Sequence, residues 1–166
     1  MDKLEMQGLQ APLKERYREN PESAQVVLSA SASLSDGIAC SIRTGKAIAE
    51  AGLHPAAGGD GTQLCSGDML LEALAACAGV TLRAVATSLE IPLEAGAVHA
   101  EGVLDFRGTL AVDREAPVGF SSINVSFELE SDASQEQLDS LVKLTERYCV
   151  VLQTVTGSTP VEVTVR

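Results

Sequence analysis

The sequence predicts an α+β fold with mainly antiparallel sheets, and three observations support this prediction. Several segments alternate apolar and polar residues, as half-buried antiparallel strands do, and residues 121–130 alternate most cleanly. Two longer stretches, beginning near Ser66 and Ser134, have the apolar spacing of helices. The strand segments come in blocks separated by single helices, an order that favours α+β over a parallel α/β fold.

The N-terminal part predicts a short helix followed by a meander of strands. Residues 11–19 are charged and favour a helix, which Asn20-Pro21 ends. Strands are expected at 25–34, 38–44 and 46–50. Residues 51–66 contain several glycines and predict a loop, whose Gly58-Gly59-Asp60-Gly61-Thr62 stretch lacks the Gly-Lys-Ser/Thr ending of a P-loop.

The longest helix is expected to begin at Ser66, a good N-cap, and to continue to about Glu90, shortly before a proline. Asp68 in its first turn complements the helix dipole. Apolar residues cover most of its circumference, so we expect burial on several sides. The run 75–79 has only small side chains and indicates a close crossing with another helix, with Cys77 at the crossing.

The C-terminal half predicts more strands and a second helix. Strands are expected at 97–104, 106–113, 121–130 and 161–165, with bulges or bends at Gly102 and Gly108. Ser134 and Gln137 have the spacing of a capping box that opens the second helix. Cys149 lies on the apolar face of that helix, close to its end.

Length, composition and charge limit the function. A chain of 166 residues, 45% of them hydrophobic, suffices for one domain with its own core. A formal net charge of -11 without a Lys/Arg cluster argues against nucleic acid and anionic membrane surfaces as partners. The apolar runs are interrupted before the roughly 20 residues that a membrane helix needs, and no signal peptide opens the chain. We therefore expect a soluble, cytoplasmic protein.

The cysteines lie at positions 40, 65, 77 and 149, and no two have the C-x-x-C spacing. A structural zinc site usually draws on closely spaced pairs, so the sequence gives little support to a metal site. Buried cysteines are commonly inert, and we interpret Cys40 and Cys65 in that way. Cys77 and Cys149 are either core residues or a working redox pair.

Several short motifs occur in a characteristic order. They are Leu71-Glu72-Ala73-Leu74-Ala75-Ala76-Cys77 leading into Thr81-Leu82, then Gly119-Phe120, Ser131-Asp132-Ala133, and Cys149 before a valine-rich strand. This set resembles the OsmC/Ohr family, which contains osmotically induced proteins and organic hydroperoxide resistance proteins. The resemblance covers roughly residues 25–166, as a single α+β domain, and residues 1–24 look like an added N-terminal segment.

The resemblance implies an intertwined homodimer in which antiparallel sheets wrap around two long central helices. It also implies a thiol peroxidase without haem, metal or other cofactor. Cys77 would attack an organic hydroperoxide, and Cys149 would resolve the oxidised Cys77. Arg43 matches the assisting arginine of the family, and Asp68 stands where a glutamate is usual. Dithiol reductants, lipoyl groups among them, restore the family enzymes.

The peroxidase mechanism requires the Cys77 thiol to ionise, and its surroundings in the sequence do not favour ionisation. Burial raises the pKa of a thiol, and Cys77 lies too far inside its helix for the helix dipole to help, so a nearby cation is expected. Arg43 is the candidate, because Arg83 lies about 120° around the helix from Cys77 and Arg147 is on another face from Cys149.

Two departures from the family pattern leave the activity open. Asp68 is one methylene shorter than glutamate, with Glu72 a poorer match, and Val150 stands where many members have proline after the second cysteine. One hypothesis is a thiol-dependent peroxidase acting on organic hydroperoxides. The other is a non-enzymatic dimer of the same fold, a binding or stress-related scaffold with structural cysteines.

Overall fold

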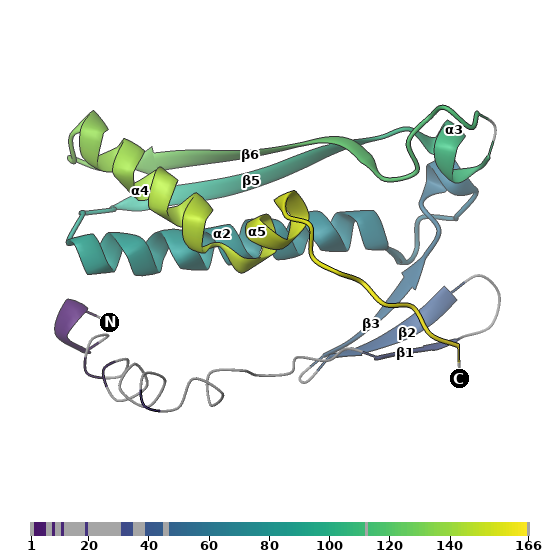
Figure 1. The fold of residues 1–166 in the computed structure, drawn as a ribbon, viewed down its shortest axis with the longest axis horizontal. Coiled ribbons are helices and arrows are strands. Elements are labelled where there is room, and N and C mark those ends of the chain that lie inside the picture. The colour runs from purple at the N-terminus through teal and green to yellow at the C-terminus, as the bar shows by residue number, and fades with distance from the viewer. Residues whose placement is uncertain are drawn as a thin grey trace. The chain divides into compact units, whose positions relative to one another are not determined.

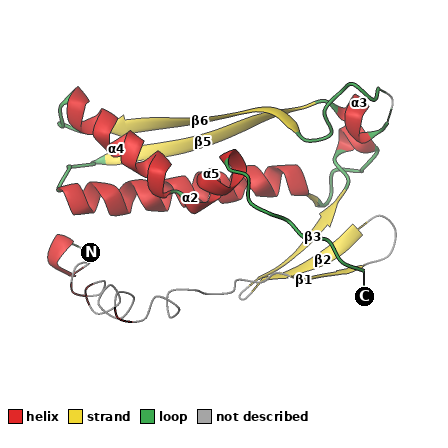
Figure 2. Cartoon of the chain, viewed as in Figure 1, coloured by secondary structure: helices red, strands yellow, loops and turns green. Residues whose placement is uncertain are grey.

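The computed structural model describes residues 2–5, 8, 11, 19, 31–34, 39–44, 47–111 and 113–165, and between 31 and 49 it describes the backbone alone. The chain forms two compact units (Figure 1). One comprises Met1–Met69 with Phe106–Val118, and the other Leu70–Asp105 with Gly119–Arg166. Helices and antiparallel strands occur together (Figure 2), which confirms the expected α+β class. Most of the expected helix at 11–19 and the first six residues of the expected strand at 25–34 lie outside the described residues.

The first unit contains a four-stranded sheet in the order β1-β2-β3-β4. Its strands are β1 Ser31–Leu34, β2 Ala39–Thr44, β3 Ala47–Gly52 and β4 Leu64–Cys65. The first three are antiparallel, and Arg43 in β2 is in register with Ser31 and Ile48. This confirms the meander. The short β4 was not expected from the sequence, and it runs parallel to β3.

The glycine-containing loop of this unit is held by local contacts. It includes the 3-10 helix η2, Pro55–Ala57, where His54 Nδ1 accepts a hydrogen bond from the Ala56 N–H at 3.0 Å. The His54 ring stacks on Phe106 with ring centroids 5.0 Å apart. Asp60 accepts hydrogen bonds from the side chain and backbone of Thr62, which lower the pKa of Asp60.

The strand expected at 106–113 is wrong, because the short helix α3, Phe106–Thr109, occupies this segment. The Leu110 N–H donates to the Phe106 carbonyl at 2.9 Å, and Arg107 pairs with Asp113 at 3.2 Å. Gly108 allows the Pro117 carbonyl to approach so closely that an added Cβ would lie 2.3 Å from it. These local bonds close a turn where the short alternation of apolar residues suggested an extended chain.

The second unit consists of a long helix, a two-stranded sheet and two further helices. The elements are α2 Ser66–Leu89, whose first turn belongs to the other unit, β5 Ala95–Leu104, β6 Phe120–Glu130, α4 Gln135–Tyr148 and α5 Val150–Thr156. Strands β5 and β6 are antiparallel, with a register shift at Val103/Leu104, next to the bend expected at Gly102. The capping box at Ser134 is confirmed. Figure 1 shows α2 running along the β5–β6 ribbon, with α4 and α5 beside it.

Two apolar clusters hold this unit together. One is centred on Leu82, Ala86, Ile91 and Leu141, and the other on Leu74, Ala78 and Cys149. The inward side chains of β6 contribute to both clusters: Ile123, Val125, Phe127 and Leu129. This matches the alternation predicted for 121–130, since the intervening residues are exposed. The core therefore lies where α2, the ribbon and α4 meet.

The strand expected at 161–165 is also wrong for this structure. Residues 157–165 form no helix or strand, and Val161, Val163 and Val165 are 84%, 88% and 99% exposed. An alternating sequence becomes a strand only when an edge of a sheet pairs with it. No edge among the described strands does so.

Helix α2 qualifies by length and composition as a membrane-crossing helix, contrary to the expectation that every apolar run is too short. A core helix of a soluble protein passes the same test. Here Leu74, Ala78 and Leu82 are buried against the ribbon and α4–α5, while Glu72 and Arg83 interrupt the exposed surface with charge. One face of α2 is therefore packed as in a core helix, while 22% of the span as a whole is buried.

Candidate active site

The site forms where α2 faces the junction between α4 and α5. Cys77 is in the middle of α2 and is half-buried, whereas Cys149 lies between the two shorter helices and is 0% exposed. Both are free thiols, and Cys77 packs against the apolar cluster that contains Cys149. The folding of the second unit thus brings together the two cysteines that the sequence singled out.

Cys149 interrupts the helix that the sequence predicts as continuous. Its φ of -72° and ψ of 107° are extended, so it caps the end of α4 and the start of α5. The Cys149 N–H still donates to the Thr145 carbonyl at 2.9 Å, and its carbonyl accepts from the Gln153 N–H at 2.9 Å. The interruption forms with a valine, Val150, directly after Cys149.

This interruption supplies hydrogen-bond donors. The first N–H groups of a helix have no acceptor within it, and in α5 these belong to Val150, Val151 and Leu152. The N–H groups of Val150 and Val151 lower the pKa of the Cys77 thiol, and those of Leu152 and Val151 act in the same direction on the pKa of Cys149. The end of one helix thereby provides partial positive charge beside a thiol of another.

The two thiols differ in acidity. Burial raises the pKa of the Cys77 thiol, but hydrogen bonds outweigh it, so that its pKa lies below the ordinary value. The donors, in falling order of effect, are the Val151 N–H, the Cys149 thiol, the Val150 N–H and the Thr81 hydroxyl. For Cys149, burial raises the pKa, and the hydrogen bond to Cys77 and the charge on Cys77 raise it further. In this pair Cys77 ionises first, and the protonated Cys149 donates to it.

The sequence predicted a cation beside Cys77, but the groups that lower the pKa of Cys77 include backbone amides of α5 instead. The second helix was predicted as uninterrupted, so no helix N-terminus was expected near Cys77. The adjacent β-branched residues Val150 and Val151 are the one signal that could have suggested an interruption, and it is weak.

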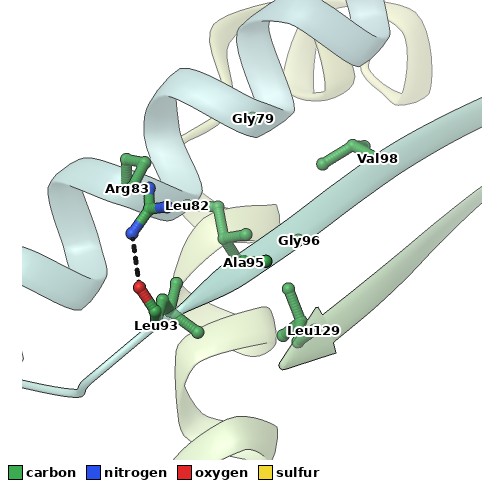
Figure 3. Close-up of a pocket in the computed structure, with 8 residues that line it drawn as sticks. All are labelled: Gly79, Leu82, Arg83, Leu93, Ala95, Gly96, Val98 and Leu129. Atoms are coloured by element: carbon green, nitrogen blue, oxygen red, sulfur yellow. Dashed lines mark hydrogen bonds between the residues drawn. The ribbon is translucent and has the colours of Figure 1, made fainter. Parts of the chain in front are cut away.

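The arginines near the cysteines in sequence point elsewhere, as expected. Arg83 Nη1 donates to the Leu93 carbonyl at 2.9 Å, at a small pocket of about 70 Å³ on another side of α2 (Figure 3). The Arg147 guanidinium lies 5.6 Å from the ring centroid of Tyr148. Neither is among the groups that shift the pKa of Cys77. Arg43 belongs to β2, in the first unit, and its side chain lies outside the described residues.

Asp68 is exposed in the first turn of α2, where a carboxylate complements the helix dipole. Nine residues at about 100° each place it about 180° around the helix from Cys77. Glu72 is exposed too. Within one chain, the structure therefore brings neither carboxylate to the cysteine pair.

A mainly apolar pocket of about 210 Å³ lies beside the apolar cluster that contains Cys149. Its wall is shared with the cysteine cluster through Leu74 and Leu152, and Glu146 is its single charged residue. The other lining residues come from β6 and the end of α5: Ile123, Val125, Phe127, Val155 and Thr156. Among the residues that the structure describes, no three His, Cys, Asp or Glu side chains are arranged to hold a metal ion.

Comparisons with known proteins agree with this architecture. The model of OsmC-like proteins matches residues 59–164. No curated protein matches the chain. A solved OsmC-like protein from Mycoplasma pneumoniae superposes with a TM-score of 0.68 at 16% identity, over 81% of this chain and 90% of that one.

Two further structures are similar. The organic hydroperoxide resistance protein OsmC from Legionella pneumophila gives a TM-score of 0.63 at 19% identity, over 80% of this chain and 93% of that one. The organic hydroperoxide resistance protein OhrB of Bacillus subtilis gives 0.56 at 20% identity, with the same two coverages. At such identities the likeness establishes the fold.

Proposed function

The chain belongs to the OsmC-like protein family, and on that premise we propose that it is a thiol-dependent peroxidase that reduces organic hydroperoxides. The observation that supports this most strongly is that Cys77, from α2, packs against the cluster containing Cys149, from the α4–α5 junction, and that the two free thiols differ in acidity. An oxidative stress role is consistent with the hydroperoxide resistance proteins of the same fold.

The proposed cycle begins with the Cys77 thiolate. Its sulfur attacks one oxygen of R-O-O-H, an S–O bond forms, and the O–O bond breaks. The alkoxide takes up the proton that the thiol released and leaves as an alcohol. Cys77 becomes a sulfenic acid, oxidised by two electrons, and the peroxide is reduced by two.

Cys149 then resolves the oxidised Cys77. Its thiol condenses with the sulfenic acid to give a disulfide and water. This requires Cα atoms within about 4.4–6.8 Å, and the packing of Cys77 against the cluster that contains Cys149 supports such an approach. A dithiol reductant, for which a lipoyl group is the proposed chemistry, regenerates both thiols by exchange and becomes a disulfide itself.

The pKa directions support this assignment of roles. Attack on a peroxide needs a thiolate, and the pKa of Cys77 is lowered. The resolving thiol is needed only after that attack, and the pKa of Cys149 is raised. The reverse assignment would require the fully buried Cys149 to meet the substrate first.

The apolar pocket supports an organic rather than an inorganic peroxide. A hydrocarbon tail gains about 25 cal/mol for each Å² of apolar surface that it buries, and hydrogen peroxide has no such surface. Six of the eight residues that line the pocket are apolar, and it shares Leu74 and Leu152 with the cysteine cluster. We place the tail of the substrate there.

We also propose a homodimer formed through α2. Its outer face presents apolar side chains at helical spacing that nothing in the second unit covers: Leu70, Ala73, Ala76, Val80 and Ala84. Val80 is 73% exposed, and small residues on either side of it allow a second helix to approach closely. In such a dimer Arg43 and Asp68 would assist the reaction as the family resemblance implies, and 1–24 would be an extension of the domain 25–166.

Intact mass spectrometry tests the proposal. One equivalent of tert-butyl hydroperoxide should remove two hydrogens from the reduced protein, and Cys77→Ser should abolish this change. Cys149→Ser should instead gain one oxygen, as a sulfenic acid on Cys77. An unchanged mass of the wild-type protein would contradict the peroxidase and favour the scaffold.

A further inference from the structure

The pocket beside the cysteine cluster has a buried end and an exposed end. Leu74 closes the buried end and is 0% exposed, whereas Glu146, Val155 and Thr156 are exposed and form the mouth. Leu74 stands three residues before Cys77 in α2, so the two side chains are neighbours on the helix surface. A substrate whose peroxide group meets Cys77 and whose tail fills the pocket therefore extends from Leu74 toward the mouth.

The mouth of the pocket carries one negative charge, the carboxylate of Glu146. Among the residues that the structure describes, no lysine, arginine or histidine forms an ion pair with it. The adjacent Arg147 lies over the ring of Tyr148, and Lys143, one turn earlier in α4, is exposed. The Thr156 hydroxyl is already engaged within α5, where it donates to the Leu152 carbonyl at 2.8 Å. A charged tail that reached the mouth would thus meet an unpaired carboxylate.

The backbone of Glu146 is held in place by a bond between the two helices that flank the pocket. Gln153 Nε2, in α5, donates to the Glu146 carbonyl at 2.9 Å, close to the end of α4. This bond spans the junction at Cys149 and fixes the last turn of α4 relative to α5. The carboxylate therefore stays at the mouth although its side chain is exposed.

We propose that Glu146 is a specificity-determining residue that disfavours hydroperoxides with an anionic tail, so that the preferred substrates are uncharged organic hydroperoxides. This inference rests on the peroxidase function proposed above. The apolar walls attract a hydrocarbon tail of either kind, but they offer no positive group to neutralise a carboxylate on it. Only an anionic tail is repelled by Glu146.

The test compares two hydroperoxides that differ mainly in charge, the para-carboxylate of cumene hydroperoxide and its methyl ester. The readout is the ratio of kcat/KM for the ester to kcat/KM for the acid. The variants are Glu146→Gln, which removes the charge, and Glu146→Lys, which reverses it. Glu136→Gln is the matched control, because Glu136 is an exposed glutamate in the first turn of the same helix and its loss changes the net charge of -11 by the same amount.

The parent protein should prefer the ester about fivefold, as expected for two like charges near a protein surface, and added salt should reduce this preference. Glu146→Gln should abolish most of the preference, Glu146→Lys should favour the acid, and Glu136→Gln should behave as the parent. Both changes at Glu146 lie at the exposed C-terminal end of a helix, where losing a negative charge is favourable, so the variants should fold. The inference is overturned if the parent shows no preference for the ester, if Glu146→Gln keeps it, or if Glu136→Gln reduces it equally.

Binding of the two product alcohols separates this inference from the proposed function. Their dissociation constants follow from shifts of leucine and valine methyl signals in NMR spectra, and no turnover is needed. If neither hydroperoxide is reduced, but the ester alcohol binds more tightly and Glu146→Gln removes the difference, the peroxidase proposal fails and the selectivity of the pocket stands. If both hydroperoxides are reduced with the same ratio in the parent and in Glu146→Gln, the function stands and the role of Glu146 is refuted.

Discussion

Val150→Pro should make Cys77 less reactive while leaving the protein at least as stable. Val150 is the first residue of α5, where proline is well tolerated because that N–H has no acceptor within the helix. The residue before a proline must be extended, and Cys149 already is, at φ -72° and ψ 107°. The substitution therefore removes one N–H group without disturbing the helix junction.

The size of the expected change in the Cys77 thiolate population follows from the rank of the Val150 N–H among the groups that lower the pKa of Cys77. A hydrogen bond to a charged group contributes about 1.5–3 kcal/mol, but Val150 ranks third of four donors and Cys77 is only half-buried. We take about 1 kcal/mol, which lowers the thiolate population at neutral pH about fivefold. Proline also restricts the unfolded chain, which stabilises the fold by about 0.4–1 kcal/mol and raises Tm by a few degrees.

The assay is a pH titration of thiolate ultraviolet absorbance, corrected with the spectrum of the Cys77→Ser variant, together with a thermal melt. Val150→Ala keeps the N–H and is the control. The reasoning predicts a midpoint for Cys77 that moves to higher pH in Val150→Pro and stays in place in Val150→Ala. Equal midpoints in both variants, or a large fall in Tm for the proline variant, would refute it.

Three further predictions concern stability and assembly. Ser134→Ala removes the N-cap of α4 and should lower the free energy of unfolding by about 1 kcal/mol, which corresponds to a fall in Tm of about 2–4 °C. Ser134→Asp should retain most of the stability. An unchanged melt for the alanine variant would contradict the capping box. Folding lowers the pKa of Cys77 from its ordinary 9.0, so the folded protein binds fewer protons there than the unfolded chain does. The difference in Tm between the wild type and Cys77→Ser, in favour of the wild type, should therefore grow as pH rises from neutral toward 9. It should disappear as pH falls through the folded-state pKa. Val80→Asp places a charge on the outer face of α2 and should shift the protein toward monomer in sedimentation experiments. Glu72→Asp is the control and should not shift it. A dimer that persists in Val80→Asp would place the interface elsewhere.

Much of the fold was predictable because its signals are local. The capping box at Ser134, the alternation along 121–130 and the end of α2 before Pro92 each depend on neighbours within a few residues. The errors at 106–113 and 161–165 arise where alternation was the only signal. In the first case local hydrogen bonds closed a turn, and in the second no described edge paired with the segment.

The cysteine pair could be chosen from the sequence, but its chemistry could not. Motif and spacing predicted Cys77 and Cys149 as the candidate pair, and in the second unit Cys77 packs against the cluster that contains Cys149. The expected need for a cation was based on burial and on distance from the start of the cysteine's own helix. It did not include a donor from another helix, because nothing within a few residues of Cys77 indicates one.

The amino-acid sequence by itself determined which segments become helices and strands and which two thiols are candidates, since periodicity and capping act over one or two turns. Only the tertiary structure decided which thiol ionises first. Acidity depends on the groups that surround a sulfur in space, and those around Cys77 include the amides exposed by the interruption at Cys149, in a distant part of the chain.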